Sequence, residues 1–178
     1  MTTRNDLIAR FGLSVSETDF EELYRDELPR IYNYFRFRVG DGPVAEDLTS
    51  ATFEKAWRNR WRFRRDLAAF STWLFTIARR VAQDHYRKQH DDVPLENVTE
   101  ARSNENLEDL IEQHTDNARI NVLLARLADR ERELVALKYG AGLTNRAIAR
   151  LSGLSESNVG VILHRAVQML HAEWKEHS

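Results

Sequence analysis

The chain has 178 residues, of which 28 are acidic and 26 basic, with a net charge of −2 and no cysteine. This length suffices for one medium domain or two small ones, and the absence of cysteine excludes disulfides, thiolate nucleophiles and cysteine-based zinc sites. Seven Gly and three Pro among many Ala, Leu, Arg and Glu favour an all-α fold.

Charge is segregated along the chain. Residues 54–90 hold ten Lys or Arg against three acids, whereas residues 91–116 hold one against nine and show no sustained helical period before Leu107. Such a polar acidic stretch is typical of a linker. We therefore predict two helical domains joined by a flexible acidic linker. The predicted boundaries are an N-terminal segment at 1–19, a first domain at 20–90, the linker at 91–116 and a second domain at 117–178.

Two helices are predicted before the basic region. Apolar residues recur at helical spacing from Leu23 to Val39, and the cluster Gly40-Asp41-Gly42-Pro43 then ends the pattern. A second helix is predicted from about Val44 to Trp57. Its core side holds Ala45, Leu48, Phe53, Ala56 and Trp57, and its outer side holds Glu46, Asp47, Glu54 and Lys55.

A basic loop at 59–69 precedes a third helix that begins near Phe70. On a helical wheel, an apolar arc with Phe70, Trp73, Leu74, Ile77, Ala78 and Val81 faces the core. The opposite arc, expected to face solvent, carries Thr76, Arg79, Arg80, Gln83, Tyr86 and Arg87. Interleaved cations and aromatics suit nucleic acid with exposed bases, because cations neutralise phosphates and rings stack on bases. An amphipathic helix pair with a solvated basic face remains an alternative.

A helix-turn-helix is predicted in the second domain. Thr144 precedes a short apolar-periodic stretch that stops at Gly153, and Ser155 is a good N-cap for the next helix. The face of that helix expected to be exposed carries Ser157, Asn158, Gly160, Val161, His164, Arg165 and Gln168. These side chains can read base edges in a major groove. A helical hairpin inside a bundle is the alternative interpretation.

Three ordered blocks resemble the extracytoplasmic-function sigma factors, small bacterial factors that give RNA polymerase its promoter specificity. Residues 45–57 (AEDLTSATFEKAW) look like the polymerase-docking helix of that family. Residues 70–80 (FSTWLFTIARR), followed by Asp84 and Arg87, are similar to its promoter-melting helix. Residues 127–133 (LADRERE), 143–155 and 163–166 (LHRA) resemble its C-terminal domain.

The resemblance implies a role for each matching residue. The polymerase-binding set is Glu46, Asp47, Leu48, Phe53 and Trp57, with Phe53 and Trp57 supporting the helix from the core. The set at the −10 element is Arg60, Trp61, Arg62, Arg64, Arg65, Trp73, Arg79, Arg80, Gln83 and Arg87. The set at the −35 element is Arg146, Ser157, Asn158, Val161, His164, Arg165 and Gln168. The implied partners are RNA polymerase core, promoter DNA and an anti-sigma factor.

Two departures from the family pattern affect these expectations. Ser50-Ala51 stands where the docking helix often has Gln-Glu, which weakens part of the implied polymerase contact. Gly160, Val161 and Ile162 occupy positions often filled by Lys, Ser and Arg. We therefore expect weak intrinsic affinity for the −35 element and a dependence on polymerase for avidity.

The residues predict neither catalysis nor a cofactor. The six histidines never form the i, i+4 pair that helical zinc sites use, so no metal site is expected, and no glycine-rich loop is present to bind phosphate. No apolar run reaches the roughly 20 residues that span a bilayer, and no export signal is evident, so a cytoplasmic protein without membrane insertion is expected. A stand-alone two-domain helix-turn-helix regulator is the main alternative function, and a purely structural interaction protein is a weaker one.

Overall fold

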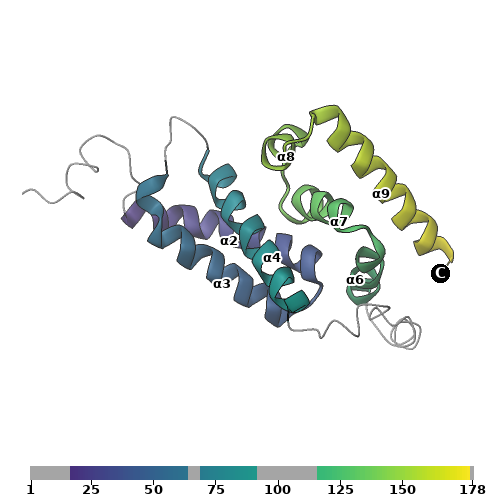
Figure 1. Ribbon diagram of the computed structural model, residues 1–178, viewed down its shortest axis with the longest axis horizontal. Coiled ribbons are helices and arrows are strands. Elements are labelled where there is room, and N and C mark those ends of the chain that lie inside the picture. The colour runs from purple at the N-terminus through teal and green to yellow at the C-terminus, as the bar shows by residue number, and fades with distance from the viewer. Residues whose placement is uncertain (1–16, 64–68, 92–115, 177–178) are drawn as a thin grey trace, which may run out of the picture.

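The computed structural model describes residues 17–63, 69–91 and 116–176, and it is all-α over these residues, as the sequence predicted. A first lobe contains α2 (Glu17–Val39), α3 (Gly42–Arg58), the 3-10 turn η1 (Arg60–Arg62) and α4 (Phe70–Asp91). A second lobe contains α6 (Asp116–Arg126), α7 (Asp129–Val135), the π turn η4 (Ala136–Gly140), α8 (Asn145–Ser152) and α9 (Glu156–Glu176). In Figure 1 the first lobe runs from purple to teal and the second from green to yellow.

Two predicted segments lie largely beyond these ranges. Nearly all of the N-terminal segment 1–19 and of the acidic linker 91–116 falls outside the described residues. Within the described ranges, no helix is both long and apolar enough to cross a bilayer.

The turn between α2 and α3 is built by the residues that the sequence marked as a break. Gly40 has a φ of +80°, a left-handed conformation that favours glycine, and its N–H donates to the Arg36 carbonyl at 2.9 Å. The Asp41 carboxylate then caps α3 by accepting from the Val44 N–H at 2.8 Å. These caps set the antiparallel packing of α2 against α3.

The core of the first lobe is aromatic. Tyr34, Phe35 and Phe75 are fully buried, and the Tyr34 and Phe75 rings meet edge to face with centroids 5.8 Å apart. Phe63, directly after η1, is also buried and packs on Phe70 at the start of α4 with centroids 5.4 Å apart. The basic segment is therefore anchored to the core at a residue that the sequence analysis assigned to a loop.

The predicted helix-turn-helix is confirmed in the second lobe. The Thr144 hydroxyl accepts from the Ala147 N–H at 3.2 Å and caps α8, and Gly153 ends that helix with a φ of +72°. The Ser155 hydroxyl accepts from the Asn158 N–H at 3.1 Å at the start of α9. Val159, Leu163 and Ala166 turn into the core, as the spacing predicted.

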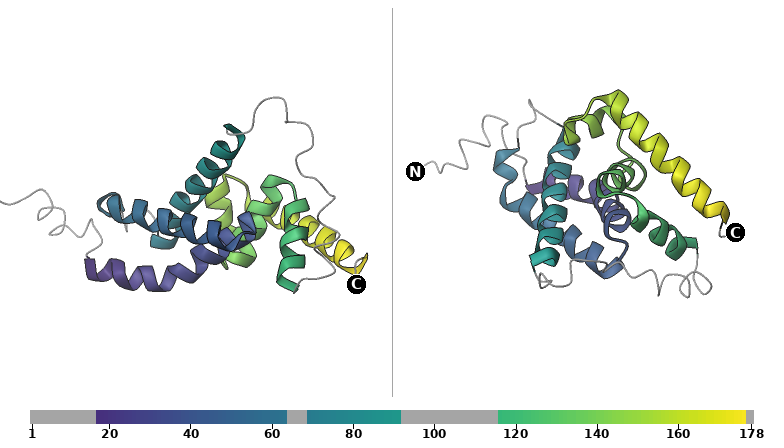
Figure 2. Two further views of the ribbon diagram at one scale, coloured as in Figure 1. Left: turned by 90° about the horizontal axis from the view of Figure 1, so that it is seen from below. Right: turned by 45° about the vertical axis from the view of Figure 1, so that its right-hand side comes forward.

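The two lobes pack directly against each other. Helix α2 contacts α7 and η4, and α4 contacts α8, so both lobes contribute to one connected hydrophobic cluster. Figure 2 shows α7 and α8 against the purple-to-teal helices from two directions. At Gly140 the approach is so close that a Cβ would lie 2.8 Å from the Asn33 carbonyl oxygen. Contact between the lobes was not predicted from the sequence.

Candidate nucleic-acid interface

The outward edge of α3 is acidic. Glu46 and Asp47 are exposed there, in the first turns of a helix whose inner face is buried. Beside them lies a shallow groove formed with α2, lined by Leu28, Pro29, Tyr32, Glu46, Thr49 and Ser50. The groove supplies an apolar floor next to two free carboxylates, which suits a protein partner with a basic rim.

Other members of the predicted polymerase-binding set do not face outward. Leu48 and Phe53 are buried, and Phe53 packs edge to face on Tyr24 with centroids 4.5 Å apart. Trp57 is half-buried and packs on Phe20. The side chain of Leu48 belongs to the α2–α3 core, on the side of the helix where the sequence analysis placed it. Phe53 and Trp57 have the supporting positions expected for them.

A cationic pocket lies where α3 meets α4. It has a volume of roughly 280 Å³ and is lined by Lys55, Asn59, Arg62, Trp73, Ile77, Arg80 and Asp84. Three of these side chains are cations and one is an acid, so the pocket is positively charged. Trp73 supplies a ring that is itself held by Phe63 and Phe70, each with a centroid distance of 5.5 Å. The pocket thus combines an aromatic wall with phosphate-binding groups.

Cations around this pocket are already paired with rings. The Arg60 guanidinium lies 3.8 Å from the Trp57 ring centroid, and that of Arg62 lies 4.8 Å from the ring centroid of Trp61. Trp61 remains 45% exposed. A stacked guanidinium has lost part of its conformational freedom before it meets a phosphate. These contacts therefore fix the orientation of the stacked guanidinium groups and indole rings and leave them accessible at the surface.

The sequence analysis missed four residues of the pocket as site residues: the apolar Ile77 and the polar Lys55, Asn59 and Asp84. Lys55 lies in the last turn of α3 and Asn59 directly follows that helix, and the Asn59 amide donates to the Lys55 carbonyl at 2.8 Å. The Lys55 ammonium lies 3.4 Å from an oxygen of Asp84 on α4. No local pattern joins two residues that are 29 positions apart, so only the packing of α3 on α4 identifies this pair.

The remaining predicted −10 residues divide into three groups. Arg80, Gln83 and Arg87 on α4 are exposed, and Arg87 lies 3.3 Å from Asp84. Arg79 is instead covered by the second lobe. Arg64 and Arg65 lie outside the described residues.

Arg79 forms a polar contact between the lobes that uses all three of its guanidinium nitrogens. Its Nε donates to Glu133 Oε1 at 2.9 Å, its Nη2 donates to Oε2 at 3.2 Å, and its Nη1 contacts the Leu151 carbonyl. Burial opposes the charge of Arg79, but the hydrogen bond and charge of Glu133 outweigh it, so the pKa of Arg79 is raised above its ordinary value. Arg79 therefore stays cationic at every working pH.

The prediction that Arg79 and Tyr86 face solvent is wrong for this conformation. Tyr86 turns toward α2, where its hydroxyl donates to the Arg38 carbonyl at 2.6 Å and the Arg38 guanidinium lies 4.7 Å from its ring centroid. The helical wheel of α4 distinguishes a side that faces the core of its own lobe from the opposite side. The wheel cannot show that a second lobe, formed by residues far away in the sequence, covers part of that opposite side.

The face of α9 that was predicted to read DNA is open. Its exposed residues are Ser157, Asn158, Val161, His164, Arg165 and Gln168, and Val161 alone is 46% exposed. Arg146 on α8 is also exposed and lies 3.5 Å from Glu156. The predicted −35 set therefore shares one accessible surface.

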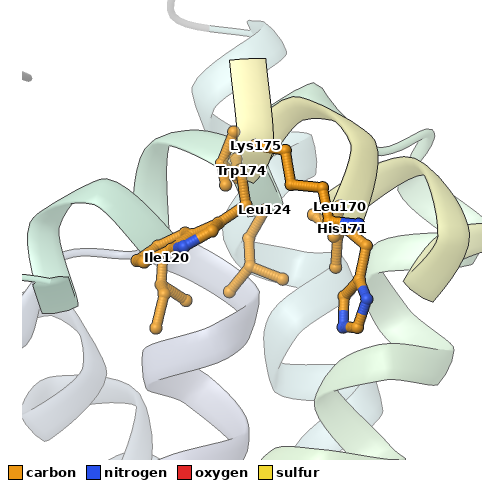
Figure 3. A pocket seen from close by; sticks show the side chains of 7 residues that line it. Ile120, Leu124, Leu170, His171, Trp174 and Lys175 are labelled. Carbon is orange, nitrogen blue, oxygen red and sulfur yellow. The ribbon is translucent and has the colours of Figure 1, made fainter. Parts of the chain in front are cut away.

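A separate apolar groove lies between α6 and α9. It is lined by Ile120, Leu123, Leu124, Leu170, His171, Trp174 and Lys175, and Figure 3 shows several of these side chains converging from the two helices. The groove residues of α9 run from Leu170 to Lys175, whereas the predicted reading residues of that helix run from Ser157 to Gln168, nearer its start. Among the residues that can be described, no group of three or more His, Asp or Glu is placed to hold a metal ion.

Comparison with known proteins identifies the family. Residues 23–91 match the model of sigma-70 region 2, and residues 118–170 match that of sigma-70 region 4. The chain is 31% identical over 154 residues to the RNA polymerase sigma factor YlaC of Bacillus subtilis, covering 82% of this chain and 86% of YlaC. This chain belongs to the extracytoplasmic-function sigma factor family. Sigma factors are transcription initiation factors and not enzymes.

Two further relatives extend this assignment. The sigma factor is 32% identical over 154 residues to the ECF RNA polymerase sigma factor BldN of Streptomyces coelicolor, and it spans 58% of the length of BldN. Its fold is similar to that of the sigma factor RpoE solved with the anti-sigma factor NepR from Bartonella quintana. That likeness has a TM-score of 0.69 at 23% identity and covers 88% of this chain and 97% of the other.

Proposed function

We propose that this sigma factor directs RNA polymerase core to promoters by dividing three tasks among three surfaces. The acidic edge of α3, with Glu46 and Asp47, docks on polymerase. The pocket between α3 and α4 holds the non-template strand at the −10 element, and the exposed face of α9 reads the −35 element. We further propose that residues 20–90 and 117–178 act as separate functional domains joined by residues 91–116, and that the protein works in the cytoplasm.

The cationic pocket is the observation that carries this proposal. Extruding a base from a duplex costs a few kcal/mol, and stacking on an aromatic ring returns about 1 to 3 kcal/mol per base. Trp73 and the exposed Trp61 supply rings, while Lys55, Arg62 and Arg80 supply charge for the adjoining phosphates. A duplex-binding regulator has no need of such a pocket, since its bases stay stacked.

Asp84 gives the pocket a specific acceptor. Carboxylates accept hydrogen bonds from the exocyclic amino groups of cytosine and adenine, and arginine donates to the acceptors of guanine. We propose that Asp84 and Arg80, one turn apart on α4, favour particular bases at the captured position. Permanganate footprinting on promoters altered at single −10 positions would identify the preferred base.

An anti-sigma partner is part of the proposal. RpoE, whose fold is shared, was solved in complex with the anti-sigma factor NepR. We propose that a protein partner covers the acidic edge of α3 and so keeps this sigma factor from polymerase. Pull-down with Asp47→Lys as the control would show whether such a partner uses the docking edge.

Run-off transcription tests the function as a whole. Purified core polymerase with this protein should produce transcripts from a subset of genomic fragments, and aligning their start regions should give two common elements. Core polymerase alone provides the baseline. A stand-alone regulator would instead bind duplex operator without polymerase and leave start-site selection unchanged, which would refute the proposal.

A further inference from the structure

The groove between α6 and α9 lies apart from the three surfaces to which the proposed function assigns polymerase and DNA. It has a volume of roughly 450 Å³, within the range of pockets that hold small molecules. Two of its lining residues, His171 and Lys175, are polar and exposed. The other five are aliphatic or aromatic: Ile120, Leu123, Leu124, Leu170 and Trp174. A mostly apolar cavity with a few polar groups is the usual form of a ligand site.

The walls of the α6–α9 groove are held by packing within the second lobe. Leu123 and Leu124 on α6 are buried, whereas Ile120, one turn earlier, is 39% exposed. The Arg119 guanidinium lies 4.0 Å from the ring centroid of Trp174, and its Nη2 donates to the Trp174 carbonyl at 2.6 Å. The indole therefore has a fixed position as one wall of the groove, which lowers the cost of ordering it around a ligand.

The polar groups of the groove gather on one side. Figure 3 shows Lys175 and His171 on one side of the groove and Trp174 on the other. Among the described residues no acid is paired with Lys175 or His171, and Glu173 is instead paired with Arg126 at 2.8 Å. Side chains four positions apart on a helix are neighbours, so the ammonium and an imidazole N–H can both donate to one carboxylate. The groove is thus apolar on one side and suited to an anion on the other.

The length of the groove favours a small ligand over a protein partner. Its α9 residues run from Leu170 to Lys175, about 8 Å of helix at 1.5 Å per residue. A stable protein interface buries about 800 Å² on each partner and involves roughly 20 to 30 residues a side. The seven residues of the groove are too few for such an interface, but they are enough to surround one hydrocarbon chain.

We propose that the α6–α9 groove binds a free medium-chain fatty acid. The hydrocarbon chain lies along Ile120, Leu124 and Leu170, and the carboxylate accepts hydrogen bonds from Lys175 and His171. A carboxyl group is ionised at neutral pH, so its charge complements the ammonium of Lys175. The groove has room for a single chain beside one pair of donors, which favours a free acid over a phospholipid with two chains.

Calorimetric titration of the full chain with decanoate at neutral pH tests the site. Hexanoate, octanoate and decanoate, each kept below its micellar concentration, should bind at one site per chain. The affinity should rise by up to about fourfold for each added methylene. Decanol is the more apolar molecule but lacks the charge, and it should bind severalfold more weakly than decanoate. An affinity that does not change with chain length, or decanol binding as tight as that of decanoate, would overturn the proposal.

Matched variants locate the binding on the groove. Lys175→Gln should lower the affinity for decanoate by up to about fivefold, as expected for the loss of an exposed ion pair, and should leave decanol binding unchanged. Lys88→Gln, an exposed lysine on α4, is the control. Ile120→Gln should weaken the binding of decanoate and decanol alike, with Tyr139→Gln, an exposed apolar residue outside the groove, as its control. Equal effects of a groove variant and its control would contradict the assignment.

Two other results would assign the groove to a different partner and so refute the proposal. The first is binding to phosphatidylglycerol vesicles that depends on Lys175, with no binding of free decanoate. The second is loss of co-elution with core polymerase in Ile120→Gln, again with no binding of decanoate. The titration itself needs neither polymerase nor DNA, so its outcome is independent of the proposed function. Circular dichroism of each variant verifies that the helices are intact.

Discussion

The two lobes present their proposed DNA surfaces in different ways. In the first lobe the surface is a pocket shared by two helices, with a tryptophan braced from behind and arginines stacked on rings. In the second lobe it is one open face of α9, which carries few cations. A base outside a duplex needs a cavity and a wall, whereas a base pair in a groove needs only side chains that reach its edge.

The lobes also differ in what the contact between them covers. The predicted reading face of α9 is exposed although the lobes touch, whereas Arg79 of the first lobe is covered by the second. Contact between the lobes therefore covers a predicted −10 residue and leaves the predicted −35 residues accessible. Substitutions in each region can test how far this division holds.

The largest effect is expected at the docking edge of the first lobe. Asp47→Lys reverses a charge on the exposed side of α3, and loss of a charged contact costs about 1.5 to 3 kcal/mol, or roughly 10- to 150-fold in affinity. Co-elution with core polymerase would measure it. Glu54→Lys, also an exposed acid on α3, is the matched control. Equal loss in both variants would show that overall charge, and not the docking edge, is responsible.

Arg79 and Arg80 should differ in stability although they are neighbours. Arg79→Ala leaves the half-buried Glu133 without its partner, and we expect a loss of about 1 to 3 kcal/mol in the free energy of unfolding. Arg80→Ala removes an exposed side chain and should change it by under about 0.5 kcal/mol. Urea denaturation followed by circular dichroism measures both. Similar losses would mean that the lobes are not in contact in solution.

Strand capture should depend on Arg80 and not on α9. Arg80→Ala is expected to weaken open-complex formation severalfold, with Lys88→Ala as an exposed cationic control on the same helix. Arg165→Ala should instead weaken binding to a −35 duplex by about 1 to 3 kcal/mol and leave −10 strand binding unchanged. Promoter fragments carrying one element at a time separate the two effects. Weaker binding of the Arg80→Ala variant to the fragment that carries only the −35 element would contradict the assignment of separate elements to the two lobes.

The smallest effect concerns Glu27, in the first lobe near the interface. Burial raises the pKa of Glu27 above 4.5 despite the opposing charge of Arg30 and the hydrogen bonds from Ser71 and Arg30. A raised carboxyl pKa means that the folded state holds the proton more tightly, so the stability contributed by the protonated group is lost as pH rises from 4.5 through the folded pKa. Relative to Glu27→Gln, the wild type should therefore lose stability over this range. Urea midpoints at pH 4.5, 5.5 and 7 would show it, and a constant difference would refute it.

Local sequence determined the helices and their ends. Ser155 caps α9 and Gly153 ends α8 as predicted, and Asp41 and Thr144 cap helices at breaks that the sequence marked. These residues act on neighbours within a few positions. The buried face of α9 follows from the 3.6-residue period of one helix. The order of the sequence motifs was likewise sufficient to indicate the family. Each motif can be recognised from consecutive or nearby residues without knowledge of the tertiary structure.

Tertiary structure alone decided which predicted residues are available. Arg79 and Glu133 are 54 positions apart, and Arg30 reaches the Ala141 carbonyl across 111 positions. The helical period of a sequence predicts which side of a helix is apolar. It does not predict whether the charged side faces water or faces a second lobe that provides partners for its hydrogen-bonding groups. The packing of α3 on α4 brings Lys55 and Asp84 together in the wall of one pocket. The packing of the second lobe on α4 likewise brings Glu133 within hydrogen-bonding distance of Arg79.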